Sequence, residues 1–177
     1  MIPKSLLIAN RAEIAIRIMR AAAELGIRTV AVFSDDDARS LHTRKADEAR
    51  RLNGVGAAAY LDAEQIIEVA KQAGCDAIHH GYGFLSEKAE FARRCADEGI
   101  MFVGPRPEIL ELFGDKVQAR SLAARCGIPL LRGTSGPTSL EEARDFFSSL
   151  GDGASIMIKA IAGGGGRGMR AVHRRNR

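Results

Sequence analysis

A run of four glycines that follows a lysine is the part of this sequence that most clearly indicates chemistry. The segment reads IKAIAGGGGRGM, residues 158–169, and comes after an apolar, strand-like stretch. A structural turn needs one or two glycines, and each further glycine costs about 0.5 to 1 kcal/mol of conformational freedom relative to alanine. Bare backbone N–H groups can approach phosphate oxygens at a distance that a β-carbon would prevent. We therefore expect a loop that closes over a polyphosphate, formed by Gly163, Gly164, Gly165 and Gly166.

Lys159 is the charge that accompanies this loop. Ile156 and Ile158 occupy one side of the preceding strand, so Lys159 falls on the other side, at the base of the loop. An ammonium about 4 Å from a phosphate charge contributes on the order of 4 kcal/mol before desolvation, at an effective dielectric near 20. The alternative is an edge-strand lysine that only prevents aggregation, but the neighbouring glycines favour phosphate binding. Lys116, in GDKVQAR, has a weaker case from pattern alone, because this segment also reads as an exposed helix start.

Two other phosphate-binding motifs do not fit the glycine run. The P-loop pattern is absent, because Gly168 is followed by Met169 and not by lysine. Gly163, Gly165 and Gly168 satisfy G-x-G-x-x-G, but the dinucleotide fingerprint requires a helix next. The residues that follow, MRAVH, alternate like a strand. The sequence therefore predicts two strands joined by a glycine loop, which is a hairpin.

The elements that precede the hairpin alternate between strand and helix over the first 105 residues. We expect strands at 4–9, 28–34, 76–80 and 100–105, and helices from Ile14 to Gly26, from Asp62 to Gly74 and over 86–97. Asp62 and Gln65 can cap the second helix reciprocally. Strands and helices that alternate in this way form βαβ units with a parallel sheet. The predicted class is α/β, with a Rossmann-like domain over residues 1–105.

The rest of the chain reads as a different arrangement. Residues 107–127 predict two helices, broken at Gly114 and Gly127, and Ser139 with Glu142 forms a capping box before a further helix. We therefore expect a helical linker over 106–130 and a smaller subdomain over 131–177 that contains the hairpin.

Charge and composition argue against a nucleic-acid partner. Five arginines and no acidic residue lie between 167 and 177, and subtracting them from the net charge of +4 leaves −1 on the preceding residues. A neutral body with a basic end is not the broad basic face of a duplex binder. Two tyrosines and no tryptophan also leave little for base stacking.

Other classes of protein and site are disfavoured by the same kind of reading. No apolar stretch approaches the ~18 residues of a membrane span and no signal peptide is visible, so we expect no membrane partner and a cytoplasmic protein. Cys75, Cys95 and Cys126 are widely spaced and fit small hydrophobes in a reducing compartment. Adjacent residues on a strand point to opposite faces, so His79 and His80 are not expected to form a metal pair.

Several segments together resemble the amino-terminal part of biotin carboxylase, the ATP-grasp component of carboxylases that act on acyl-CoAs, pyruvate or urea. The similarity extends from about Lys4 to Val172, in family order, through LLIANRAEIAIRIMRAAAELGIRTVAVFSDDDARSLHTRKADEA, HHGYGFLSE, FVGP, GDK and IKAIAGGGGRGM. Two positions depart from the family's usual pattern. Ala12 replaces the glycine of NRGEIA, and His80 replaces the proline of HPGYGFLSE.

The resemblance implies a Rossmann-like pre-ATP-grasp domain, a helical linker and a partial ATP-grasp lid subdomain. It implies that Lys116 and Lys159 bind ATP phosphates, that the glycine run over 163–166 closes over them, and that Met169 lines the adenine pocket. It also implies that Tyr82 and Gly83 lie near the ureido ring of biotin. From the residues alone, this last segment is only a glycine-rich loop after a parallel strand, at the edge where such sheets bind ligands.

The activity implied for the parent enzyme is the carboxylation of biotin. Bicarbonate attacks the γ-phosphate of ATP to give carboxyphosphate, and its carbon passes to the biotin N1′ nitrogen. The implied partners are a biotinylated carrier domain, a carboxyltransferase component and, through dimerisation, a second copy. In the family, the magnesium ligands, the general base and the arginines for bicarbonate and biotin come after the glycine loop. We therefore expect no catalytic residue or metal ligand in this chain, and no turnover by the chain alone.

Two alternatives remain open at this point. One is another ATP-grasp ligase, such as an enzyme like carbamoyl-phosphate synthetase, although HHGYGFLSE argues against it. The other is a non-catalytic interaction module that has kept the fold and lost the chemistry.

Overall fold

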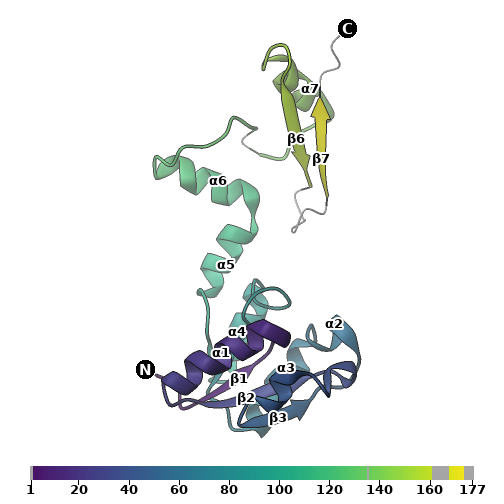
Figure 1. Ribbon diagram of the computed structural model, residues 1–177. Coiled ribbons are helices and arrows are strands. Elements are labelled where there is room, and N and C mark those ends of the chain that lie inside the picture. Colours follow the sequence, from purple (N-terminus) through teal and green to yellow (C-terminus); the bar gives the residue numbers. More distant parts are fainter. Residues whose placement is uncertain (1, 135, 161–167, 174–177) are drawn as a thin grey trace. The chain divides into compact units, whose positions relative to one another are not determined.

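A computed structural model describes the chain except for residues 1, 135, 161–167 and 174–177 (Figure 1). The chain forms two compact units, Met1–Glu111 and Leu112–Arg177, and each is described by itself below.

The first unit contains a five-stranded sheet in the order β3-β2-β1-β4-β5, and every pair of neighbouring strands is parallel. The strands are β1 (Ser5–Ile8), β2 (Arg28–Phe33), β3 (Glu48–Arg51), β4 (Ala77–His79) and β5 (Met101–Phe102). The chain adds β2 and β3 on one side of β1 and then β4 and β5 on its other side. The strand order therefore reverses between β1 and β4, and ligands bind at such switch points in open α/β sheets.

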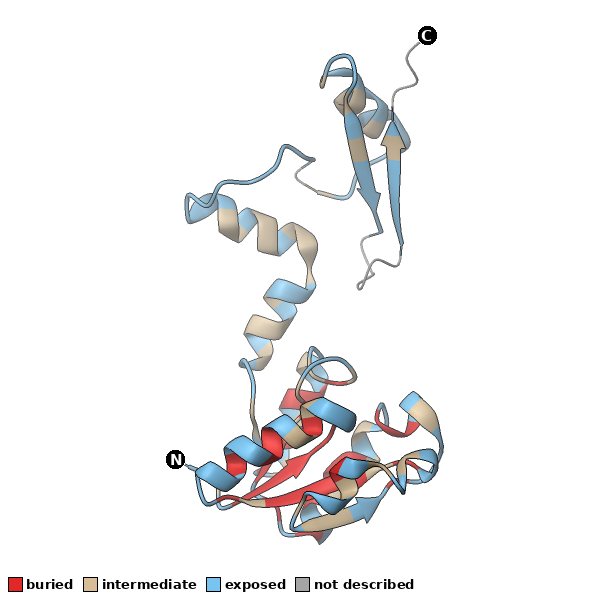
Figure 2. Ribbon diagram, viewed as in Figure 1, coloured by how far each residue is buried: buried red, intermediate tan, exposed pale blue. Residues whose placement is uncertain are grey.

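Helices cover both faces of this sheet, because its strands contribute to two separate buried clusters. Figure 2 shows the buried segments, in red, in this unit. They are α1 (Ala12–Glu24), α2 (Gly56–Ala59), α3 (Ala63–Gln72) and α4 (Ala89–Asp97), with 3₁₀ turns η1 (Asp35–Asp37) and η2 (Leu41–Arg44). Ile18 of α1 shares one buried cluster with Ile8 of β1. Ile66 of α3 and Phe91 of α4 share the other cluster with Leu7. Successive residues of β1 thus enter opposite layers, as the two-residue period of a strand requires.

The predicted parallel sheet and the strand–helix alternation are confirmed, but strand β3 and the short helix α2 were not among the expected elements, and other elements differ at their ends. The helix expected over 86–97 is α4, which begins at Ala89, and β5 covers only two residues of the expected 100–105. The Asp62 cap is present, because its Oδ1 accepts from the Gln65 N–H at 3.0 Å. The reciprocal half was wrong: the Gln65 side chain accepts from the Asn53 N–H instead.

The second unit consists of short elements. They are α6 (Lys116–Arg125), α7 (Leu140–Ser148), β6 (Ser155–Lys159) and β7 (Met169–His173), while α5 (Pro107–Gly114) spans the boundary between the units. The Ser139–Glu142 capping box is confirmed, and β6 pairs with β7 as the expected antiparallel hairpin. Each described residue beyond Ile100 is at least partly exposed. The described part of this unit therefore encloses no side chain completely, and an isolated two-stranded hairpin is marginally stable in water.

Within the described residues, no helix has the length and apolar character needed to cross a membrane. The predicted loop residues Gly163, Gly164, Gly165 and Gly166 lie outside the described residues.

Candidate functional site

Lys159 and Met169 are direct partners across the hairpin. They form the last pair of the β6–β7 ladder before the glycine segment, and the Ala160 N–H donates to the Gly168 carbonyl at 2.7 Å just beyond it. Residues directly opposite in an antiparallel pair project to the same face. The structure thus places an ammonium group beside a thioether, although the two residues are ten positions apart in the sequence.

The face that carries Lys159 and Met169 is open to solvent. The neighbouring pair on this face, Met157 with Ala171, is also exposed. On the other face the pair Ile156 and Val172 is half-buried, while Ile158 and Arg170 are exposed as well. The exposed face offers one positive charge next to apolar surface, and those are the chemical features that a nucleotide requires. The predicted orientation of Lys159 away from Ile156 agrees with this arrangement.

Gly168 has a structural reason to be glycine. Its φ is +72°, and a β-carbon placed there would lie 2.8 Å from Cβ of Ala160. Both the left-handed backbone and the close approach of the two strands exclude a side chain. This glycine therefore belongs to the closing pair of the hairpin.

Lys116 is the first residue of α6 and is half-buried. The preceding Asp115 caps the helix, because its Oδ1 accepts from the N–H groups of Val117 at 2.8 Å and Gln118 at 3.1 Å. The GDK segment is thus a helix start, as its pattern indicated. A role for Lys116 in phosphate binding stays a prediction.

Tyr82 and Gly83 line a crevice of about 360 Å³ in the first unit. The crevice is formed by the turn between β1 and α1 and by the loop after β4, so it lies at the switch point of the sheet. Its volume is within the range of small-molecule sites. Its walls include Arg11, Ala12, Ile14, Tyr82, Gly83 and Phe84. The loop that was expected at a ligand-binding edge therefore does face a hollow there.

The Tyr82 side chain is tied to the other wall of this crevice. Its hydroxyl donates to Oε1 of Glu13 at 2.6 Å, and this hydrogen bond raises the pKa of the Tyr82 phenol and lowers the pKa of Glu13. Tyr82 as a whole remains 62% exposed. A phenol that is anchored at its hydroxyl while its ring stays accessible can pack against a flat ligand.

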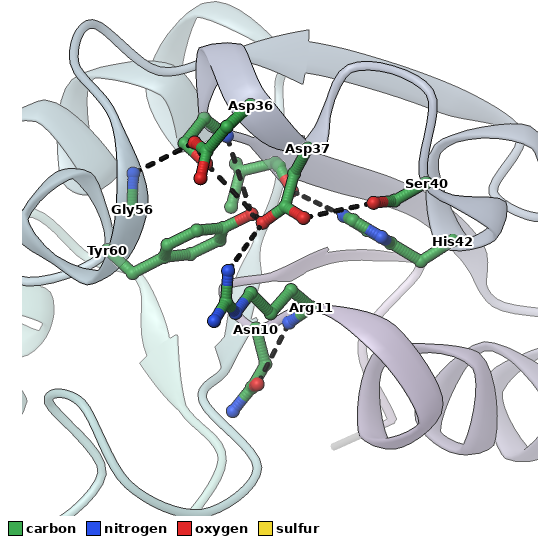
Figure 3. Close-up of polar contacts among 10 residues, drawn as sticks. Asn10, Arg11, Asp36, Asp37, Ser40, His42, Gly56 and Tyr60 are labelled. Atoms are coloured by element: carbon green, nitrogen blue, oxygen red, sulfur yellow. Dashed lines mark hydrogen bonds and ion pairs between the residues drawn. The ribbon is translucent and has the colours of Figure 1, made fainter.

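A polar network behind the crevice was not anticipated from the sequence (Figure 3). Asp37 accepts hydrogen bonds from the Tyr60 hydroxyl at 2.9 Å, from Nη1 of Arg11 at 3.1 Å and from the Ser40 hydroxyl at 2.9 Å. The Arg11 guanidinium also lies 5.9 Å from the centroid of the Tyr60 ring. Burial, together with the bond to Asp37, raises the pKa of Tyr60 to about 12. This network fixes the Arg11 side chain at the crevice wall.

No local signal could have revealed this network, because its members come from separate elements. Arg11 and Asp37 are separated by 26 positions, and Tyr60 and Asp37 by 23. The acidic segment around Asp37 reads only as a polar loop in the sequence. The order of strands in the sheet brings these residues together.

The two adjacent histidines have unrelated surroundings. Nδ1 of His79 accepts from the Gly81 N–H at 2.9 Å, whereas the ring of His80 packs against Phe91 and Phe102. Over the described ranges, no group of three or more His, Cys, Asp and Glu side chains is placed to hold a metal ion.

Family models match both parts of the chain. The model for the N-terminal domain of biotin carboxylase matches residues 2–110, and the model for the ATP binding domain of the carbamoyl-phosphate synthase L chain matches residues 115–177. The pyruvate carboxylase of Staphylococcus aureus is 57% identical over 172 residues, which are 96% of this chain and 15% of that protein. Human mitochondrial pyruvate carboxylase is 53% identical over 174 residues, 96% of this chain and 14% of its own length.

Solved structures agree with the sequence relatives. The biotin carboxylase of Campylobacter jejuni, in a complex named for β,γ-ATP, has a TM-score of 0.92 at 39% identity, covering 98% of this chain and 39% of its own. The biotin carboxylase domain of a single-chain bacterial carboxylase has a TM-score of 0.86 at 50% identity, covering 96% of this chain and 37% of its own.

These relatives support the carboxylase interpretation over the carbamoyl-phosphate synthetase alternative. The chain spans 15% or less of the length of these two curated relatives. Because the model for residues 2–110 covers more than half of the chain, and the parallel sheet and its crevice fall within that range, this chain belongs to the biotin carboxylase N-terminal domain family.

Proposed function

We propose that this chain is the amino-terminal part of an ATP-dependent biotin carboxylase within a biotin-dependent acyl-CoA or pyruvate carboxylase. In this reaction, bicarbonate, ATP and the biotin of a carrier domain yield carboxybiotin, ADP and phosphate. The identity with pyruvate carboxylases supports the proposal. A carboxyltransferase component would receive the carboxyl group, and dimerisation with a second copy is part of the same proposal.

The observation that carries the ATP site is the pairing of Lys159 with Met169 on the exposed face of the hairpin. We propose that the Lys159 ammonium binds the polyphosphate of ATP and that Met169 contacts the adenine. Lys116 would provide a second phosphate contact, and Gly163 to Gly166 would cover the phosphates with backbone N–H groups. Cations that are fixed in this way stabilise the charge on a transferred phosphoryl group.

We propose that the crevice at the switch point receives the ureido end of biotin. Ile14 and Phe84 give it apolar walls, and the exposed ring of Tyr82 with the bare backbone of Gly83 can receive a flat polar ring. We propose that Tyr82 and Gly83 position this ring. Magnesium, which neutralises phosphate charge in such reactions, would be held by residues outside this chain.

The proposal can be tested in the carboxylase that contains this chain. We expect ATP cleavage that depends on bicarbonate and is stimulated by free biotin. Lys159→Gln removes the ammonium and should raise KM for ATP by about 10- to 100-fold, or about 1.4 to 2.7 kcal/mol, because most of the Coulomb energy is offset by desolvation.

Arg170→Gln is the matched control for this variant. Arg170 lies one rung further along the same ladder, opposite Ile158, so its side chain projects to the other face of the hairpin. The variant should leave KM for ATP within about twofold, less than the tenfold that 1.4 kcal/mol represents. Equal effects of the two substitutions would refute the nucleotide site at Lys159. ATP cleavage that is indifferent to biotin would instead refute the biotin carboxylase assignment.

A further inference from the structure

Asn10 joins the two walls of the crevice through a single side chain. It follows β1, is 3% exposed, and donates from Nδ2 to the carbonyl of His80 at 2.6 Å and to the carbonyl of Tyr82 at 2.9 Å. Its Oδ1 accepts from the Arg11 N–H at 2.8 Å, the bond drawn beside Asn10 in Figure 3. The first βα turn is thereby bound to a loop that lies 70 positions further along the chain.

These three hydrogen bonds require an amide. The side chain must present two N–H donors to two carbonyls and one acceptor to an N–H, all from one plane. Aspartate of the same shape has no donor when ionised and would place a charge against two carbonyl oxygens. Serine has one donor, and alanine has none. Asn10 therefore does what no other side chain of its size can do at this position.

The loop that Asn10 holds has a left-handed backbone at three residues, of which only Phe84 carries a side chain that disfavours it. Gly81, Gly83 and Phe84 have φ values of +64°, +73° and +47°. A β-carbon on Gly81 would lie 3.1 Å from Nδ2 of Asn10 and 3.0 Å from Cγ1 of Ile14, so the loop runs directly against the amide. A left-handed conformation at a residue such as Phe84 persists where surrounding contacts determine it. The Asn10 amide bonds the carbonyls of His80 and Tyr82, the residues on either side of Gly81.

We propose that Asn10 is a positioning residue for biotin, holding the backbone of Tyr82 and Gly83 in the conformation that receives the ureido ring. This inference rests on the proposed function. Asn10 is one of the residues that line the crevice, but it is only 3% exposed and its amide is occupied by the three bonds, so it acts through the loop. Glu13 holds the Tyr82 hydroxyl, and bonds within the segment join the Gly81 N–H to Nδ1 of His79 and the Ser86 N–H to the Gly83 carbonyl. Asn10 adds the bonds that tie the carbonyls of His80 and Tyr82 to the first βα turn.

The first test uses this chain and measures hydrogen exchange of the amides at 81–84. In Asn10→Ala these amides should exchange about tenfold faster, equivalent to about 1.4 kcal/mol, because both carbonyl anchors are lost. Ser5→Ala is the matched control. Ser5 is also buried, and its hydroxyl bonds Gly74 and Asp76 at the opposite end of β1. Equal acceleration of the loop in both variants would overturn the proposed clamp.

The second test uses the carboxylase that contains this chain and measures KM for biotin and KM for ATP separately. Asn10→Ala should raise KM for free biotin about tenfold and leave KM for ATP unchanged, whereas Asn10→Ser, which restores one donor, should be intermediate. Ser5→Ala should change neither constant. An unchanged KM for biotin in active Asn10→Ala would overturn the proposal. If the unsubstituted enzyme shows no biotin-dependent cleavage, the proposed function itself fails, while the exchange measurement still decides whether Asn10 clamps the loop.

Discussion

The burial of His80 makes the stability of the first unit dependent on pH. His80 is 1% exposed, and its ring lies nearly perpendicular to the ring of Phe91 at a centroid distance of 4.5 Å. Among the described residues, neither ring nitrogen has a hydrogen-bond partner of normal geometry. Burial therefore lowers the pKa of His80 from 6.5 to about 4, and the backbone of Ala9 opposes this only in part.

The size and sign of the effect follow from this pKa. A shift from 6.5 to about 4 corresponds to about 3 kcal/mol of stability, at about 1.36 kcal/mol per unit. Between these two values the unfolded chain binds the proton and the folded chain does not, so stability falls as pH falls. The contribution is complete above pH 6.5 and is lost near pH 4. Carboxylates affect stability at lower pH than His80 does. Hydrogen bonds from Thr29 lower the pKa of Asp47, so the contribution of Asp47 to stability is lost only below the ordinary titration range of an aspartate.

His80→Leu isolates this contribution. We expect the unsubstituted chain to lose about 3 kcal/mol more of its free energy of unfolding than the variant as pH is lowered from 7.5 to about 4. Urea unfolding followed by tyrosine fluorescence reports the first unit specifically, because the chain has no tryptophan and its two tyrosines, Tyr60 and Tyr82, both lie there.

The control for this experiment is Ile66→Val, in the buried face of α3. It should lower the free energy of unfolding by about 0.5 to 1.5 kcal/mol at every pH and leave the slope unchanged. If His80→Leu and the unsubstituted chain lose stability in parallel over this range, the desolvation argument for His80 is refuted.

Three further predictions concern the backbone and the nucleotide. Ala12→Gly should stabilise the first unit by about 0.5 to 1 kcal/mol in urea unfolding, because Ala12 has a φ of +53° that glycine adopts without strain. The control, Ala21→Gly on the exposed side of the same helix, should destabilise the unit by a similar amount. Gly168→Ala should disrupt the hairpin through its contact with Ala160, seen as faster hydrogen exchange in 155–159, and unchanged exchange would contradict the argued clash. The chain alone should show neither bicarbonate-dependent phosphate release nor a change of exchange in 169–173 at micromolar ATP, since it contributes only part of the proposed site. Strong protection of those strand residues would disprove this last prediction.

Ala12, which replaces the family's usual glycine, has a backbone conformation that the sequence alone did not indicate. In the sequence, Ala12 indicates only that a methyl group stands where the family usually has glycine. The structure shows that it does so in the left-handed region, at the first residue of α1. Such strain depends on how the β1–α1 turn is held against the loop after β4, so no residue pattern in the turn itself could indicate it.

The sequence by itself determined the elements whose cause is local. The capping box of Ser139, the alternation that turns Lys159 away from Ile156, and the strand–helix succession of the first unit all depend on neighbours within a few residues. For the same reason the sequence predicted β6 and β7 as a hairpin. The predicted role of Tyr82 and Gly83 in biotin binding came from the family resemblance, because their own sequence pattern indicates only a glycine-rich loop.

Only the tertiary structure decided which distant residues meet. The bonds from Asn10 to the loop after β4, the contact between Arg11 and Asp37, and the burial of His80 all require β1 to lie between β2 and β4. The order of strands is set by packing two helical layers against one sheet, and these contacts are spread over the whole unit. Periodicity within a segment reports which of its faces is buried, but it does not report which other segment covers that face.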